Sequence, residues 1–145
     1  MSIFDELEAQ YREIDKCLSS SEFKGRKHGS ARKENRYERR RKRNDEAYFL
    51  FMFTRLEDHI KRESKKLIER KQKAPRHILP NQTKGEFSFM DRLTLLTEKD
   101  GSDFNQVSGY YEERNAIAHG GTFTDRITVR TVAFELKRLY KVLKA

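Results

Sequence analysis

The sequence predicts an all-α protein, an up-and-down bundle of about five helices in a single domain covering residues 1–145. Apolar residues recur at steps of three and four along most of the chain, which is the spacing of one face of a helix. Only two prolines and seven glycines interrupt it. Only 35% of the residues are hydrophobic, but the ten phenylalanines and six tyrosines supply material for a core. A chain of 145 residues is long enough to enclose one.

The first half of the chain predicts two helices separated by a loop. The first covers residues 3–19, and the second begins within residues 24–44 and continues to about Lys73, before Pro75 and Pro80. Residues 19–21 and 25–30 interrupt the apolar pattern and are expected to form the loop. The inner faces are predicted to carry Phe4, Leu7, Tyr11, Ile14 and Leu18 in the first helix, and Phe49, Met52, Phe53, Leu56, Ile60 and Leu67 in the second.

Three further helices are expected after the prolines. The third ends at Asp100-Gly101, and the fourth begins with Asp103 as N-cap and Gln106 in the position of a capping box, and ends at Gly120-Gly121. The last covers about residues 125–143. Residues 127–132 partly alternate as a strand would, but the helical spacing continues to residue 143 and no partner strand is evident. The predicted buried residues are Phe89, Met90, Leu93 and Leu96, then Phe104, Val107, Tyr111 and Ala118, then Val129, Val132, Ala133, Leu136, Tyr140 and Leu143.

The basic charge is confined to one block. Residues 24–44 hold eleven Lys/Arg and two acids, which equals the whole net charge of +9, so the remainder is neutral. Such a local excess, predicted to be an insertion or a helix extension, favours a polyanionic partner. The alternatives are a solvated helix face or a disordered loop. The candidate RNA-binding residues in the block are Arg39, Arg40, Arg41, Lys42 and Arg43, with Tyr37 and Tyr48 beside them as residues that could stack on a base.

Other features narrow the class of protein. The longest apolar run, residues 48–53, is too short to span a membrane, and the amino terminus lacks the layout of a secretion signal. A single cysteine, Cys17, fits a reducing compartment, so a cytoplasmic protein is expected. One cysteine and four scattered histidines lack zinc-site spacing, and no phosphate-binding glycine loop is present, so no metal or cofactor is expected. His59 borders an inner face and is expected to be a hydrogen-bonded histidine of the bundle.

The segment Arg114-Asn-Ala-Ile-Ala-His119-Gly-Gly carries the chemistry. Arginine supplies a fixed cation for phosphate charge, and histidine gains and loses a proton near neutral pH. Arg114 lies on the stripe of the fourth helix that is predicted to be buried. A charge there must be paired, placed at an edge of the bundle, or covered by another subunit. Because Arg114 and His119 lie about 140° apart on a straight helix, they converge on one ligand only if the backbone turns after His119.

One arginine and one histidine make an incomplete site for RNA cleavage through the 2′-hydroxyl. That reaction needs a base, an acid for the leaving oxygen, and cations for the charged transition state. A two-fold dimer that pairs this helix end with its copy supplies two of each residue. Two facing arginines would repel unless an anion lies between them, so a homodimer of this kind also predicts a phosphate site.

The segment Arg114-Asn115-Ala-Ile-Ala-His119-Gly resembles the Arg-(four to six)-His signature of the HEPN superfamily, in which asparagine commonly follows the arginine. The resemblance covers residues 103–143 by motif and the rest by helix pattern. It implies a dimeric, metal-independent endoribonuclease that acts as a toxin or antiviral effector, with the motifs of both subunits lining one cleft. It also implies that Arg114 and His119 are catalytic, that Asn115 orients them or the phosphate, and that an antitoxin or defence-system partner exists. Tyr110 and Tyr111 are expected to be packing or interface residues instead of catalysts, and Tyr110 is also a candidate RNA-binding residue that could line the cleft.

The sequence departs from one subgroup of that superfamily. Some toxins carry a tyrosine two residues after the histidine, which a partner nucleotidyltransferase modifies, whereas this chain has Gly121 there. Two alternatives stay open. Arg114 can pair with Glu112 or Glu113 while His119 only completes a helix carboxyl end, where a cation is favourable. The chain can also be a catalytically inactive HEPN-like subunit that binds RNA or a protein.

Overall fold

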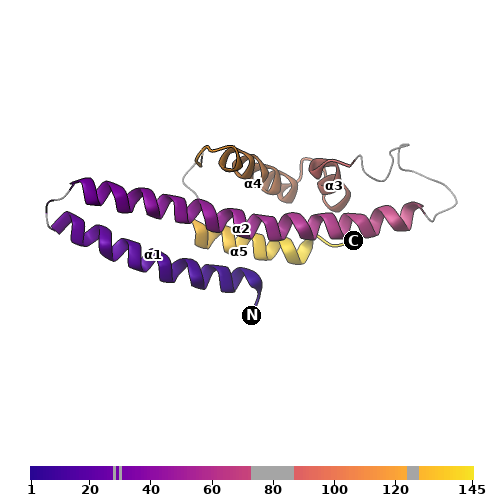
Figure 1. Cartoon of the computed structure of the whole chain (residues 1–145). Coiled ribbons are helices and arrows are strands. Elements are labelled where there is room, and N and C mark those ends of the chain that lie inside the picture. Colours follow the sequence, from indigo (N-terminus) through magenta and orange to yellow (C-terminus); the bar gives the residue numbers. More distant parts are fainter. Residues whose placement is uncertain (28, 30, 73–86, 124–127) are drawn as a thin grey trace.

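The computed structural model describes residues 1–27, 29, 31–72, 87–123 and 128–145. These residues form five helices and no β-strand, which confirms the predicted all-α bundle. The helix α2 is the centre of the fold and contacts each of the other four. In Figure 1, α3 and α4 lie on one side of it, and α1 and α5 lie on the other. The helices are α1 (Ile3–Lys27), α2 (Ala31–Gln72), α3 (Phe89–Leu96), α4 (Ser102–Ala118) and α5 (Val129–Val142).

The core lies around the second half of α2, where aromatic side chains from several helices meet. Phe53 packs edge-on against Phe89, and Phe89 stacks on Tyr111 at a ring-centroid distance of 4.4 Å. The predicted inner faces of α2 and α5 are confirmed, since nearly all their members are buried. The fully buried large side chains are Phe4, Phe49, Phe53, Met52, Leu56, Ile60, Leu93, Leu136, Leu139, Leu143, Val107 and Val129.

The first two helices form one long antiparallel hairpin, because α1 runs to Lys27 and α2 begins at Ala31. The predicted loop over residues 19–30 is therefore wrong for residues 19–27. The Ser20 and Ser21 hydroxyls donate to the carbonyl oxygens of Lys16 and Cys17 one turn earlier, so these serines bond to their own helix instead of ending it. The basic block is thus a helix extension. We call the end of the hairpin that contains the basic block, residues 15–27 and 31–43, the arm. The arm projects beyond α3, α4 and α5 (Figure 1).

Two predicted helix ends are also corrected. The third helix ends at Leu96 instead of at Asp100-Gly101; a capping box of Ser88 and Asp91 opens it. The fourth helix begins at Ser102 after Gly101, with no side-chain cap, so the predicted Asp103–Gln106 box is wrong. Both of those side chains accept hydrogen bonds from Arg138 Nη2 of α5, at 2.7 Å each, and so hold α4 against α5.

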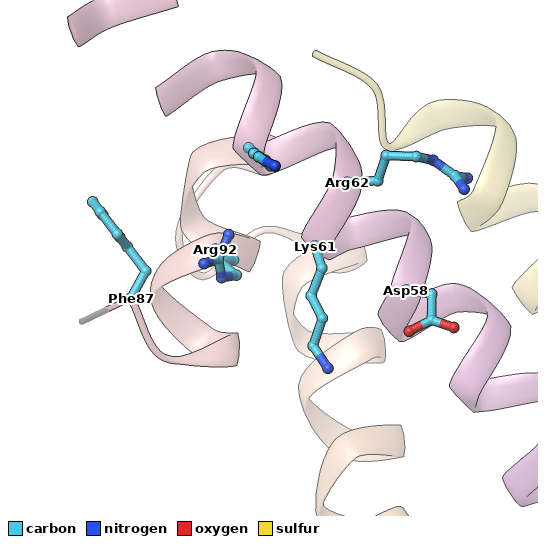
Figure 2. Close-up of a pocket in the computed structure, with 6 residues that line it drawn as sticks. Asp58, Lys61, Arg62, Phe87 and Arg92 are labelled. Atoms are coloured by element: carbon cyan, nitrogen blue, oxygen red, sulfur yellow. The ribbon is translucent and has the colours of Figure 1, made fainter. Parts of the chain in front are cut away.

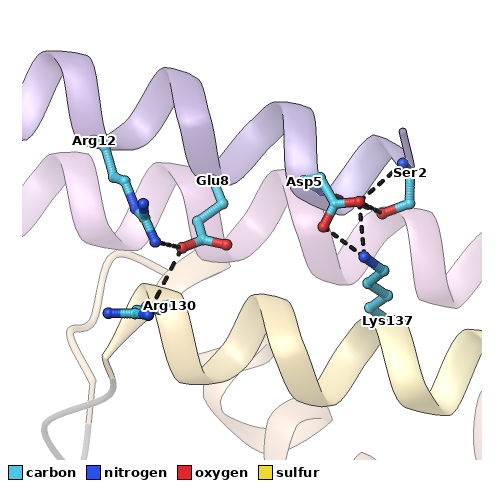
Figure 3. A network of polar contacts seen from close by, with 6 residues as sticks. All are labelled: Ser2, Asp5, Glu8, Arg12, Arg130 and Lys137. Carbon is cyan, nitrogen blue, oxygen red and sulfur yellow. Dashed lines mark hydrogen bonds and ion pairs between the residues drawn. The ribbon is translucent and has the colours of Figure 1, made fainter.

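The last helix is observed from Val129 to Val142, with Thr128 as its extended N-cap, so residues 129–132 are helical and not a strand. The predicted start near residue 125 lies outside the described residues. A seam of ion pairs joins α5 to α1 (Figure 3). Lys137 Nζ lies 2.7 Å from Asp5 Oδ1, and this hydrogen bond is the main reason that the pKa of Asp5 is held well below its ordinary value.

Candidate functional site at the carboxyl end of α4

The carboxyl end of α4 closes in a glycine turn. The Gly120 N–H donates to the carbonyl oxygen of Ile117 at 3.0 Å, and the Gly121 N–H donates to that of Ala116 at 2.8 Å. This pair of hydrogen bonds is a Schellman motif, with Gly120 in the left-handed region at φ 83°. A Cβ on Gly121 would lie 2.7 Å from the Ala116 carbonyl oxygen, so both glycines are needed for the turn. The backbone therefore changes course directly after His119, as predicted.

His119 is the last residue before this turn and occupies the C-cap position of α4. Its side chain is exposed, and in the part of the chain that the structure describes its ring makes no hydrogen bond or ion pair. Ala118 beside it is exposed too, which corrects the prediction that α4 buries it, because the end of α4 extends past the core. The imidazole is thus open to solvent and to a ligand or second subunit.

Arg114 lies one turn earlier and is held by two acceptors. Its Nη1 donates to Oδ1 of Asn115 at 3.1 Å, and its Nη2 lies 3.7 Å from Oε2 of Glu57 in α2. The side chain keeps 33% of its exposure. Of the outcomes expected for a charge on this stripe, the structure shows pairing at a partly exposed edge. The partner comes from α2 and is neither Glu112 nor Glu113.

Glu57 was not identified from the sequence, although it is the residue that fixes the arginine. Its side chain is only 12% exposed, and Lys61 Nζ lies 3.4 Å from its other oxygen, Oε1. A carboxylate next to Leu56 on the inner stripe of α2 was the available signal, because a buried acid requires a cation. Arg114 and Lys61 thus share one buried counter-ion where α4 crosses α2.

Arg114, Asn115 and His119 therefore all lie in the last turn and a half of α4, but the structure does not join all three. The amide of Asn115 contacts the guanidinium, as expected for an orienting residue. No hydrogen bond links Arg114 to His119 within the described residues. The α4 end thus presents a fixed cation and a free imidazole, and the described residues place no second imidazole beside them as the other proton-transfer group.

Tyr110 begins the same stretch of α4 but points into the bundle. Its hydroxyl donates to Glu135 Oε2 of α5, and its ring packs on Phe49 at 5.9 Å. Burial first, and the hydrogen bond to Glu135 second, raise the pKa of Tyr110. Its hydroxyl is therefore protonated at neutral pH and already engaged in joining α4 to α5.

The five predicted RNA-binding residues of the basic block do not share a face of α2. Arg39, Arg40 and Arg43 line a shallow groove with Arg32 and Arg36, which the sequence analysis did not single out. From Arg32 to Arg43, these five arginines follow one another at intervals of four, three, one and three residues. Such intervals place them on one face of a helix and could have identified them from the sequence. Arg41 instead bonds Asp15 of α1, with Nε 2.9 Å from Oδ1. Lys42 is exposed on another side of the helix.

The two tyrosines next to the block also have different positions. Tyr48 is buried in the core at 8% exposure, so it cannot stack on a base in this fold. The Tyr37 ring lies 5.6 Å below the guanidinium of Arg40, in a cation–π contact that leaves it half-buried. Among the described residues, the lining of the groove therefore contains arginines and no aromatic side chain, while the exposed ring of Phe23 belongs to α1.

A second basic depression, of about 620 Å³, lies between α2 and α3 (Figure 2). Its cations are largely engaged by the protein: Lys61 pairs with Glu57, and Arg92 donates to Ser64 at 3.2 Å. Arg62 points away toward α5 in Figure 2, where it donates to the Tyr140 hydroxyl at 3.0 Å. The depression thus offers an anion less uncompensated charge than the arginine groove does. Its lining residues are Asp58, Lys61, Arg62, Lys65, Phe87 and Arg92.

Comparison of the chain with protein-family models, curated proteins and solved structures gave no match. No helix among the described residues is long and apolar enough to cross a membrane. In the same residues, no group of three or more His, Cys, Asp and Glu side chains is placed to hold a metal ion. The case for a function therefore rests on the residues of the α4 end and on their geometry.

Proposed function

We propose that this protein is a metal-independent endoribonuclease of the HEPN type, with its site at the carboxyl end of α4. One observation carries the proposal: His119 stands exposed at a glycine turn, one turn after an arginine that Glu57 and Asn115 hold in place. In the reaction, His119 takes the proton of the 2′-hydroxyl or gives one to the leaving oxygen. Arg114 stabilises the negative charge of the pentacovalent phosphate, and Asn115 orients the guanidinium.

The single chain supports a dimeric site because its own half is incomplete. In the described part of the chain, the α4 end offers the imidazole of His119 alone, whereas the reaction uses a base and an acid. A two-fold axis near the end of α4 would bring in a second His119 and a second Arg114. The glycine turn favours such an arrangement, because Gly120 and Gly121 carry no side chain that would keep a partner chain or an RNA backbone away.

The test is cleavage of a mixed RNA pool by purified protein in the presence of a divalent-metal chelator. Wild type is expected to produce 2′,3′-cyclic phosphate ends, and Arg114→Ala and His119→Ala are each expected to reduce the rate by at least about a hundredfold. Arg55→Ala removes an exposed arginine that lies about 200° around α2 from Glu57, and so on another face of the helix, and serves as the matched control. Equal rates for wild type and both site variants would refute the assignment.

The dimer is tested separately by dilution. If two chains build one site, the activity per molecule falls once the protein is diluted below its dimer dissociation constant. Light scattering over the same concentrations reports the fraction of dimer. An activity per molecule that stays constant while the dimer dissociates would place the complete site in one chain.

The second candidate is an inactive HEPN-like subunit that binds RNA or a partner protein. The ion pair of Arg114 with Glu57 favours it, because that carboxylate already neutralises part of the charge that a phosphate would use. This candidate predicts RNA binding without product and harmless overexpression. The nuclease proposal, as a toxin or antiviral effector held by a partner, predicts growth arrest that His119→Ala relieves.

A further inference from the structure

The first third of α2 carries a continuous arginine face. Arg32, Arg36, Arg39, Arg40 and Arg43 line one groove of the arm, of about 400 Å³. At about 100° per residue they occupy little more than a quarter of the helix circumference, and they extend about 16 Å along its axis. All five side chains are exposed, and in the described part of the chain none of them makes an ion pair.

This face is turned away from α1. Arg41 lies on the opposite side of α2, where its ion pair with Asp15 marks the contact between the two helices. The arm therefore uses one arginine to hold the hairpin together and leaves five on the outside. Figure 1 shows no other helix alongside this part of α2.

The arrangement opposes the stability of the free helix. The five arginines form five like-charged pairs at spacings of three or four residues, and each such pair destabilises a helix. A bound polyanion would convert this repulsion into attraction and would release its counterions. The guanidinium groups also suit phosphate, because they donate two parallel hydrogen bonds to it.

We infer that this arginine face binds the sugar–phosphate backbone of RNA, independently of base sequence. The described lining of the groove consists of arginines without an aromatic ring, which argues for backbone contact without base stacking. A membrane surface fits less well, because a membrane-binding helix needs a row of large apolar side chains, whereas Phe23 of α1, at 67% exposure, is the one large hydrophobic side chain that the described part of the arm exposes. Only the choice of RNA over DNA rests on the proposed function. The binding of phosphate follows from the arginine side chains themselves.

The site lies close to the end of α4. The Phe123 ring, two residues after the glycine turn, packs on Phe49 at 5.4 Å, and Phe49 is six residues, or about 9 Å along the helix, from Arg43. An RNA strand that follows the arginine face toward the body of the protein thus arrives at the level of the α4 end along the axis of α2. The arm would supply affinity, and the α4 end would supply chemistry.

The experiment measures binding in a His119→Ala background, so that RNA stays intact whatever the catalytic outcome. The probe is a fluorescein-labelled single-stranded poly-uridine of about 20 nucleotides, followed by anisotropy at several salt concentrations. Five phosphate contacts predict a slope of log K against log salt of about −3.5. The affinity should therefore fall about a hundredfold between 50 and 200 mM salt. The triple variant Arg36→Gln, Arg39→Gln, Arg43→Gln should give a slope near about −1.4 and a loss of about sevenfold.

The matched control removes three charges from other faces, as Lys16→Gln, Lys42→Gln, Arg55→Gln, all of them exposed positions. It should keep the wild-type slope. Circular dichroism should show that the arginine variant is as helical as wild type and melts no earlier, because like-charge repulsion has been removed.

Equal losses in both triple variants would show that net charge alone binds RNA and would overturn the inference. Preference for phosphatidylglycerol vesicles over RNA would overturn it as well, and equal binding of duplex DNA would remove only the choice of RNA. The outcome is separable from the nuclease proposal. Wild type that binds RNA through this face without cutting it would refute the proposed function alone, whereas cleavage with unchanged binding in the arginine variant would refute the arginine face alone.

Discussion

The two ends of α2 do opposite things with the same secondary structure. Its part within the body of the protein places Phe49, Phe53 and Leu56 at no exposure, and α2 as a whole contacts the four other helices. Along its first third, α1 is the helix that lies beside it in Figure 1, and the Arg41–Asp15 ion pair takes part in that contact; just beyond, the Tyr11 hydroxyl donates to Asp45. The body therefore owes its stability to apolar burial, whereas the arm keeps its cations outside and has little core of its own.

The prediction with the largest expected effect compares the same substitution, leucine to alanine, in the body and in the arm. Leu56→Ala empties a fully buried site and should lower the free energy of unfolding by about 2–5 kcal/mol. Leu18→Ala in the half-buried face of the arm should cost about 1 kcal/mol or less, because its site is already open to water. Urea unfolding followed by circular dichroism measures both. Similar costs would show that the arm has a core equivalent to that of the body.

A second pair of substitutions tests the glycine turn at the α4 end. Gly121→Ala should destabilise the protein by about 1–3 kcal/mol, because the new Cβ would lie 2.7 Å from the Ala116 carbonyl oxygen. Gly109→Ala in the same helix meets no atom within 4 Å and should stabilise it by about 0.5–1 kcal/mol. Thermal melts of the two variants should therefore shift in opposite directions. Shifts of the same sign would contradict the turn geometry.

His59 offers a test of the body by pH. It is 3% exposed, its Nε2–H donates to the Leu143 carbonyl oxygen at 2.7 Å, and Arg62 donates to its Nδ1 at 3.3 Å. Burial lowers the pKa of His59 below its ordinary value of 6.5, so the ring is neutral in the fold. The unfolded chain then binds the extra proton, and stability is present above about pH 6.5 and declines as the pH falls toward the folded pKa.

The measurement is the melting temperature of wild type and of His59→Gln at pH 8 and pH 5.5. Wild type should lose a few degrees more than the variant on acidification, since glutamine can keep a donor for Leu143 but does not titrate. An equal loss in both proteins would mean that other groups cause the pH dependence. This histidine was correctly predicted to be hydrogen-bonded in the bundle.

The helices could be predicted from the sequence because their apolar faces have a regular spacing, and α2 and α5 follow it closely. The ends could not, since they depend on bonds that spacing does not show. Ser20 and Ser21 extend α1 by bonding to their own helix, and Asp103 and Gln106 are recruited by Arg138 instead of capping α4.

The candidate site divides in the same way. The Gly120–Gly121 turn follows from residue type alone, because only glycine readily takes the left-handed conformation. The partner of Arg114 does not, because Glu57 lies 57 positions earlier in the chain and reaches the arginine only when α4 packs on α2. The arginine face lay within the predicted basic block, and helical spacing alone separates its members from Arg41; that Arg41 faces α1 and the other five face away follows only from the packing of α1 on α2.

The smallest expected effect concerns the contact that holds the arm together. Arg41 bonds both oxygens of Asp15, at 2.9 and 3.3 Å, but the two side chains keep 37% and 24% of their exposure. A double-mutant cycle of Arg41→Gln and Asp15→Asn should give a coupling of about 0.5–1 kcal/mol, at the upper end for surface pairs because the contact is bidentate. The coupling should shrink in 1 M salt, where charges are screened over about 3 Å. Arg43→Gln combined with Asp15→Asn is the control, since Arg43 belongs to the outer face and should show no coupling. A coupling near zero would mean that the Arg41–Asp15 ion pair does not hold the two helices of the arm together. Arg41 would then be as available to a polyanion as the arginines of the outer face.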